Sequence, residues 1–100
     1  MNRKEIAIEF AKSLNFPEIK KIILYGSVAR DEDDENSDID ILIITADKNK
    51  IKHTVYEKVT DILLELEEYV SAKILTTNDY EHVKNTHFIS VVEKEGIVIG

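Results

Sequence analysis

The chain contains no cysteine, and only one proline and three glycines among its 100 residues. The lack of cysteine excludes disulfides, cysteine-ligated zinc and a thiol nucleophile, and it fits a reducing cytoplasm. No run of about 18 apolar residues is present, and charges occupy the first ten residues, where a signal peptide needs apolar side chains. We therefore expect a cytoplasmic protein that neither enters a membrane nor is secreted.

Basic residues are outnumbered, with 13 Lys and Arg against 20 Asp and Glu, for a net charge of −7. Non-specific binding to nucleic acid depends on neutralising phosphates, so nucleic acid is not an expected partner. Residues 31–40 alone hold seven acids and no base, which equals the whole net charge. The run 31–36 is expected to form a solvated, mobile loop, and it lacks the spacing of a calcium-binding loop.

The length and composition indicate one globular domain spanning residues 1–100. The chain is 43% hydrophobic and 33% charged, which is typical of a protein that folds by itself. A chain of this size buries only about 60–68% of its unfolded surface. A ligand site is therefore expected to be shallow or to be completed by a partner.

The spacing of apolar residues predicts an α+β fold in which a small mixed sheet of three or four strands packs against helices. The pattern predicts helices over residues 6–14, 51–66, around 80–83, and 88–95, and strands over residues 21–25, 39–44, 69–75 and 97–99. Phe88, Ile89 and Val92 are expected to face inward from the last helix, which Gly96 would cap. Residues 76–79 have the composition of a turn with a helix N-cap.

Gly26 and Ser27 stand where the apolar strand 21–25 gives way to residues compatible with a helix. Backbone N–H groups and a hydroxyl would converge at that point, which suits a phosphate group. Gly26 would allow a close approach of the backbone or a positive φ. The pair alone is also typical of an ordinary turn with an N-cap. Neither a P-loop nor a Rossmann glycine motif is present, and Ser27 does not stand in a nucleophile elbow.

Asp38 and Asp40 flank Ile39 at the start of the next apolar strand. Residues two apart in a strand point to the same face, so both carboxylates would lie side by side. Carboxylates this close repel each other unless a cation binds, and Mg²⁺ favours one or two carboxylates together with substrate phosphates. Asp40 is the stronger indicator because it interrupts an otherwise apolar strand. Asp38 also fits an exposed charge at a strand end.

These two segments together carry a resemblance to a known family. In order, residues 26–40 read Gly-Ser-x-Ala-Arg, then six residues, then Ser-Asp-x-Asp. This pattern resembles the signature of the DNA polymerase β-like nucleotidyltransferase superfamily, and most of all its minimal, stand-alone members, the MNT-domain proteins. The family's order of helices and strands can be followed across nearly the whole chain. The resemblance implies the polymerase β-like nucleotidyltransferase fold.

The resemblance also implies roles for particular residues. Arg30 would stabilise the helix and loop or contact a phosphate of the nucleotide. The two carboxylates would be catalytic and would hold Mg²⁺. The residues that the resemblance assigns are Gly26, Ser27, Arg30 and Ser37 for the nucleotide phosphates, and Asp38 and Asp40 for the metal.

The chain departs from the family on the following strand, where active members carry a third carboxylate. Lys73 occupies the expected position, and a shift of register by one or two residues offers only Ala72 or Ser71. Lys73 would either place its ammonium beside Asp40, which would make the site catalytically inactive, or reach a bound triphosphate. In the second case the site would bind a Mg²⁺-nucleotide but lack a general base.

Two hypotheses for the function follow from the resemblance. The first is a Mg²⁺-dependent enzyme that moves a nucleoside monophosphate, AMP from ATP, onto an acceptor hydroxyl. Stand-alone members are similar to subunits of toxin–antitoxin pairs with a helical HEPN protein, so the acceptor would lie on such a partner. The second hypothesis is a catalytically degenerate subunit that binds and regulates a partner protein.

Overall fold

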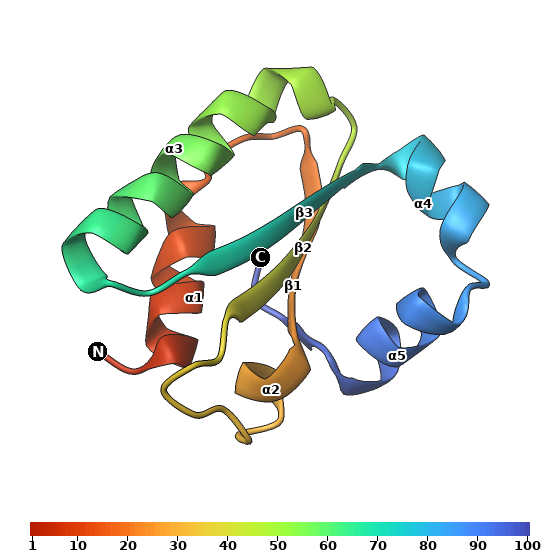
Figure 1. Cartoon of the computed structure of the whole chain (residues 1–100). Coiled ribbons are helices and arrows are strands. Elements are labelled where there is room, and N and C mark those ends of the chain that lie inside the picture. The colour runs from red at the N-terminus through yellow and green to blue at the C-terminus, as the bar shows by residue number, and fades with distance from the viewer.

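A computed structural model describes all 100 residues and shows one mixed sheet with helices on both faces (Figure 1). The elements in chain order are α1 (Arg3–Ser13), β1 (Ile19–Tyr25), α2 (Gly26–Ala29), β2 (Ile39–Thr45), α3 (Lys48–Leu66), β3 (Val70–Thr76), α4 (Thr77–Val83), α5 (His87–Glu95) and β4 (Ile97–Val98). None of these helices is both long enough and apolar enough to cross a membrane.

The four strands lie in the order β3-β2-β1-β4. β1 pairs antiparallel with β2 and with β4, whereas β2 and β3 are parallel. A parallel pair needs a crossover connection, and α3 supplies it. The predicted α+β fold with a small mixed sheet is therefore confirmed.

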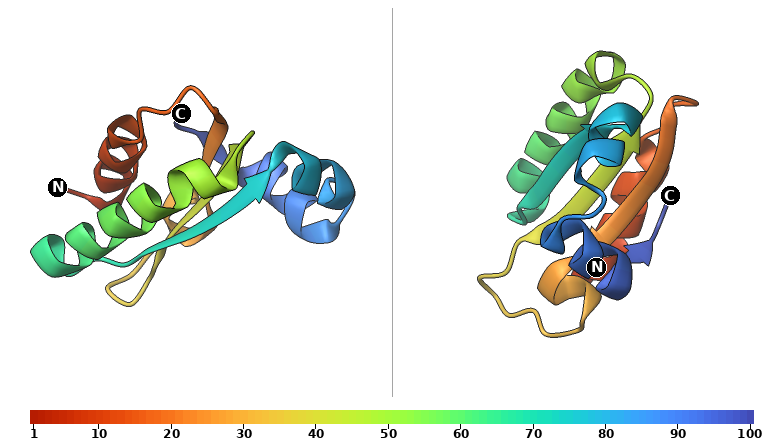
Figure 2. Two further views of the ribbon diagram at one scale, coloured as in Figure 1. Left: turned by 90° about the horizontal axis from the view of Figure 1, so that it is seen from above. Right: turned by 90° about the vertical axis from the view of Figure 1, so that its right-hand side faces the viewer.

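The sheet separates the core into two parts, one on each face, and helices cover both faces (Figure 2). α1 and α3 cover one face with the larger cluster, which contains Phe10, Ile41 and Val55. α5 covers part of the other face, where Leu42, Ile44 and Ile89 meet. β2 is buried on both faces, which explains its nearly continuous apolar sequence. Asp40 is the only β2 residue that is not fully buried.

The ends of the helices follow the sequence signals. The Thr76 side chain accepts a hydrogen bond from the Asp79 backbone N–H, and the Asp79 carboxylate accepts one from the Thr76 N–H. This capping box fixes the sharp change from β3 to α4 and confirms the predicted turn. Gly96 ends α5 as expected, and its N–H donates to the Val92 carbonyl.

One expectation about burial is wrong, and a second group of apolar side chains is also exposed. Phe88 is 43% exposed rather than inward, because Ile89 and Val92 are the buried residues of α5, whereas the Phe88 ring meets the Tyr25 ring edge to face. Leu63 and Leu66 are 44% and 47% exposed, although they belong to the apolar stripe of α3. A helix of 19 residues is about 28 Å long and a strand of seven about 23 Å, so the end of α3 runs past the sheet (Figure 1).

Candidate nucleotide and metal site

β1 runs directly into α2 through Gly26, which has a φ of +77°. A residue with a Cβ is strained in this left-handed region, so the turn requires glycine. The first turn of a helix leaves backbone N–H groups without an intrahelical acceptor, and the half-buried Ser27 stands in that turn. The predicted change from strand to helix at Gly26 and Ser27 is therefore confirmed, although the helix has only four residues.

The turn at Gly26 lies against the carboxylate of Asp40. Tyr25 pairs with Asp40 in the antiparallel register, which places the end of β1 beside the start of β2. A Cβ built on Gly26 would lie 2.5 Å from Asp40 Oδ2. No side chain fits between them, so glycine is needed at this position for space as well as for φ. The fold thus joins the two segments that the sequence pattern singled out.

Asp38 and Asp40 differ in their surroundings. Asp38 is exposed and precedes β2, whereas Asp40 is half-buried within the strand. Burial raises the pKa of the Asp40 carboxyl, Lys73 and Arg30 oppose the rise, and Asp38 adds to it. The ionised form of Asp40 is thus held in a place that disfavours it, a condition that a bound cation relieves.

The donor set at this point consists of two carboxylates. None of the ion pairs of the chain involves either of them. No cluster of three or more His, Asp or Glu side chains suited to a metal is present. Two carboxylates beside the turn at Gly26 fit Mg²⁺, which keeps water and substrate oxygens as its other ligands.

β3 brings no acid to the site. Ser71 pairs with Asp40 and Lys73 with Leu42 in the parallel register, so both side chains share the face of Asp40. Ala72 points to the opposite face and packs against the larger core. The residues present at the place of the family's third carboxylate are therefore a serine and a lysine.

Lys73 does not form an ion pair with Asp40. Its Nζ donates to the Tyr25 hydroxyl at 3.3 Å and lies 6.0 Å from the Tyr25 ring centroid and 5.9 Å from the Phe88 ring centroid. The two rings meet edge to face, with centroids 5.6 Å apart. The ammonium is therefore held near the rings and leaves Asp40 free for a cation.

Arg30 and Ser37 are engaged in contacts of the intervening loop. Arg30 Nε donates to Glu32 Oε1 at 2.7 Å and Nη1 to Glu95 Oε2 at 3.1 Å, which ties α2 to the end of α5. Ser37 Oγ accepts a hydrogen bond from the Asp34 N–H at 3.0 Å. Arg30 thus braces the helix and loop, and a phosphate contact for either side chain remains a prediction.

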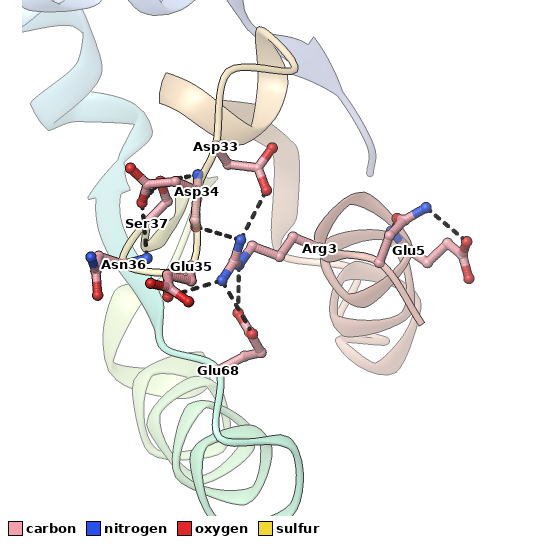
Figure 3. A network of polar contacts seen from close by, with 9 residues as sticks. Arg3, Glu5, Asp33, Asp34, Glu35, Asn36, Ser37 and Glu68 are labelled. Carbon is pink, nitrogen blue, oxygen red and sulfur yellow. Dashed lines mark hydrogen bonds and ion pairs between the residues drawn. The ribbon is translucent and has the colours of Figure 1, made fainter.

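Arg3 is a structural residue of this region that sequence reasoning missed (Figure 3). Its Nε donates to Glu68 Oε2 at 2.6 Å, and its Nη1 donates to Asp33 Oδ2 at 3.0 Å and to the Asp34 carbonyl at 2.6 Å. Its Nη2 donates to the Glu35 carbonyl at 3.3 Å. The acidic loop is exposed as expected, but a single guanidinium from α1 anchors it to the segment before β3.

We expect Arg3→Ala to lower the free energy of unfolding by about 1–3 kcal/mol, because hydrogen bonds to charged groups are lost and the partly buried Glu68 keeps no partner. Urea denaturation measures this change. Lys4→Ala is the matched control, since Lys4 pairs with the exposed Asp31 at 2.9 Å and such surface pairs contribute less than about 1 kcal/mol. Equal effects of the two substitutions would contradict the anchoring role of Arg3.

Comparison with known proteins gives a family and a set of similar folds. Residues 5–100 match the family model "Polymerase beta, Nucleotidyltransferase". Comparison with curated proteins gives no significant match. Two similar solved chains come from a toxin–antitoxin with AMP-PNP (21% identity, TM-score 0.58) and a mutant of the toxin–antitoxin MntA–HpeT (20% identity, TM-score 0.61). Each alignment covers 100% of this chain and 73% of the other. The chain therefore belongs to the polymerase beta nucleotidyltransferase family.

Proposed function

We propose that this protein is a Mg²⁺-dependent nucleotidyltransferase that moves AMP from ATP onto a hydroxyl of a partner protein in a HEPN/MNT-type toxin–antitoxin pair. One observation carries the proposal: the Gly26 turn and the Asp40 carboxylate are so close that a Cβ on Gly26 would lie 2.5 Å from Oδ2. A phosphate at the turn would therefore lie beside the carboxylate that holds the metal. Membership of the family supports the same activity.

The residues of the site have separate tasks in this reaction. The turn at Gly26 and Ser27 would bind the β- and γ-phosphates, and Asp38 and Asp40 would hold the metal ion. Mg²⁺ supplies charge neutralisation on the phosphate oxygens and orients the α-phosphate for in-line attack. The acceptor oxygen would form a bond to the α-phosphorus while the bond from the α-phosphorus to the bridging oxygen of the β-phosphate breaks. The proton of the hydroxyl would pass to solvent water, and pyrophosphate would leave.

The acceptor is proposed to come from another protein because the site is open to solvent and because of the likeness to toxin–antitoxin structures. Asp38 is exposed, and no helix or loop of residues 1–100 covers it. The similar structures are toxin–antitoxin complexes, one of which was solved with AMP-PNP. A helical partner of the HEPN type would complete the site and present the hydroxyl.

A second function is favoured by the residues of β3. Ser71 and Lys73 face the site, so no third carboxylate is present to deprotonate the acceptor. In that case the protein is a degenerate subunit that binds a nucleotide and regulates its partner without transfer. Lys73 would then hold the triphosphate by its charge.

Transfer of label from α-phosphate-labelled ATP with Mg²⁺, in lysate of the native host, tests the proposal. We expect the label to appear on one protein band with the wild-type chain and to be lost with Asp40→Asn. Label that persists with Asp40→Asn would contradict the proposed site.

The variant Lys73→Asp separates the two functions because it restores a carboxylate on the face of Asp40. If the wild-type protein transfers no label and Lys73→Asp does, the subunit is degenerate. If the wild-type protein transfers label, the third carboxylate is dispensable in this chain. Lys84→Asp is the matched control, since Lys84 lies after α4, outside the site, and is exposed.

A further inference from the structure

An apolar cavity adjoins the candidate site on the same face of the sheet. Its volume is about 290 Å³, and it lies between β2, β3 and the segment that joins α4 to α5. Its wall consists mainly of Leu42, Leu75, Val83 and Phe88, with Lys73 at its side. Pockets of about 300 Å³ or more with apolar and aromatic walls are typical of small-molecule sites.

The cavity lies on the same face of the sheet as the Asp40 carboxylate. Leu42 is two residues beyond Asp40 and points to the same face of β2, so their Cα atoms are about 7 Å apart. A ribose separates the α-phosphate of a nucleotide from its base by a comparable span. A nucleotide whose phosphates lie at Gly26 would therefore reach the cavity with its base.

The side chains at the mouth of the cavity suit a flat, uncharged ring. Phe88 is 43% exposed, and its ring lines the cavity while it contacts the Tyr25 ring edge to face. Lys73 brings a positive charge close to both rings, and no acid lines the cavity. An anionic nucleotide is thus attracted at this place, whereas Asp38 and Asp40 would repel it without a cation.

We propose that this cavity binds the purine base of the nucleotide, an inference that rests on the proposed function. Phe88 is the specificity-determining residue, since stacking on an aromatic ring accepts any base and gives a larger contact to a purine. The only polar side chains of the wall are those of Lys73 and Thr86, which are too few to distinguish adenine from guanine. The site therefore selects purine over pyrimidine nucleotides and discriminates little between ATP and GTP.

Titration calorimetry with ATP, GTP, CTP, UTP and inorganic tripolyphosphate, each with Mg²⁺, tests this inference on the full chain. We expect ATP and GTP to bind within about threefold of each other and roughly tenfold more tightly than UTP, CTP or tripolyphosphate. Phe88→Ala should lower the affinity for ATP about tenfold and leave the affinity for tripolyphosphate unchanged. Tyr56→Ala is the matched control, because Tyr56 is 48% exposed on α3, which covers the opposite face.

The outcomes separate this inference from the proposed function. If ATP binds no more tightly than tripolyphosphate, the base pocket alone is overturned. The same holds if ATP binds Phe88→Ala as tightly as it binds the wild type. If Asp40→Asn leaves the affinity for tripolyphosphate unchanged, the phosphate and metal site is overturned, and the base pocket with it. Phe88→Leu keeps the apolar volume without the ring, so it gives the same test if Phe88→Ala does not fold.

Discussion

Asp40→Asn is expected to lower nucleotidyl transfer by more than about a hundredfold and to remove the effect of Mg²⁺ on nucleotide binding. A metal ion contributes several kcal/mol to the stabilisation of charge in the transition state, and each 1.4 kcal/mol is a factor of ten in rate. Asparagine keeps the shape of the side chain but loses the charge that attracts the cation. Label transfer and calorimetry, each with and without Mg²⁺, measure the two effects.

The stability of the same variant provides an internal control. Because burial raises the pKa of Asp40 in the folded state, its ionised form opposes folding at neutral pH, and a neutral amide removes that cost. We therefore expect Asp40→Asn to unfold at the same temperature as the wild type or at a higher one. Asp61→Asn makes the same chemical change at an exposed position of α3 and should keep transfer intact. A variant that loses activity together with its fold would not support the metal site.

The parts of the site that could be predicted from the sequence are those fixed by neighbouring residues. Asp40 is conspicuous because it interrupts a strand that is buried on both faces, and Gly26 stands where an apolar strand meets a helix. Antiparallel pairing of the two strands then brings both residues together. The place of Lys73 near the site is expected from the resemblance to the family, whereas the register that puts it on the face of Asp40 comes from the parallel pairing of β2 with β3.

Contacts between distant segments could not be predicted in this way. Arg3 and Glu68 are 65 residues apart, and two of the Arg3 hydrogen bonds end on backbone carbonyls, which carry no sequence signal. The direction of the Lys73 side chain depends on Tyr25 and on the placement of Phe88 by the joint between α4 and α5. An apolar residue at helical spacing predicts a buried side chain, whereas Phe88 lies at the rim of a cavity.

Gly26→Ala is expected to damage both the fold and the site. A residue with a Cβ at a φ of +77° costs about 1–2 kcal/mol, which in a chain of 100 residues corresponds to a fall in Tm of about 5–15 °C. The new methyl group would also meet Asp40 Oδ2 at 2.5 Å, so the carboxylate must move away from the turn. Thermal unfolding should show the loss of stability, and calorimetry a loss of Mg²⁺–ATP affinity of more than about tenfold.

A double-mutant cycle separates the backbone strain from the contact with the carboxylate. In an Asp40→Ala background the atom nearest to the new methyl group is absent, whereas the φ of residue 26 is the same. Gly26→Ala should therefore cost less free energy of unfolding in that background than in the wild type, by about 0.5–3 kcal/mol. An equal cost in both backgrounds would mean that glycine is required only for its φ. A smaller cost in the Asp40→Ala background would show that the close approach of the turn to the carboxylate, on which the phosphate and metal site depends, selects glycine.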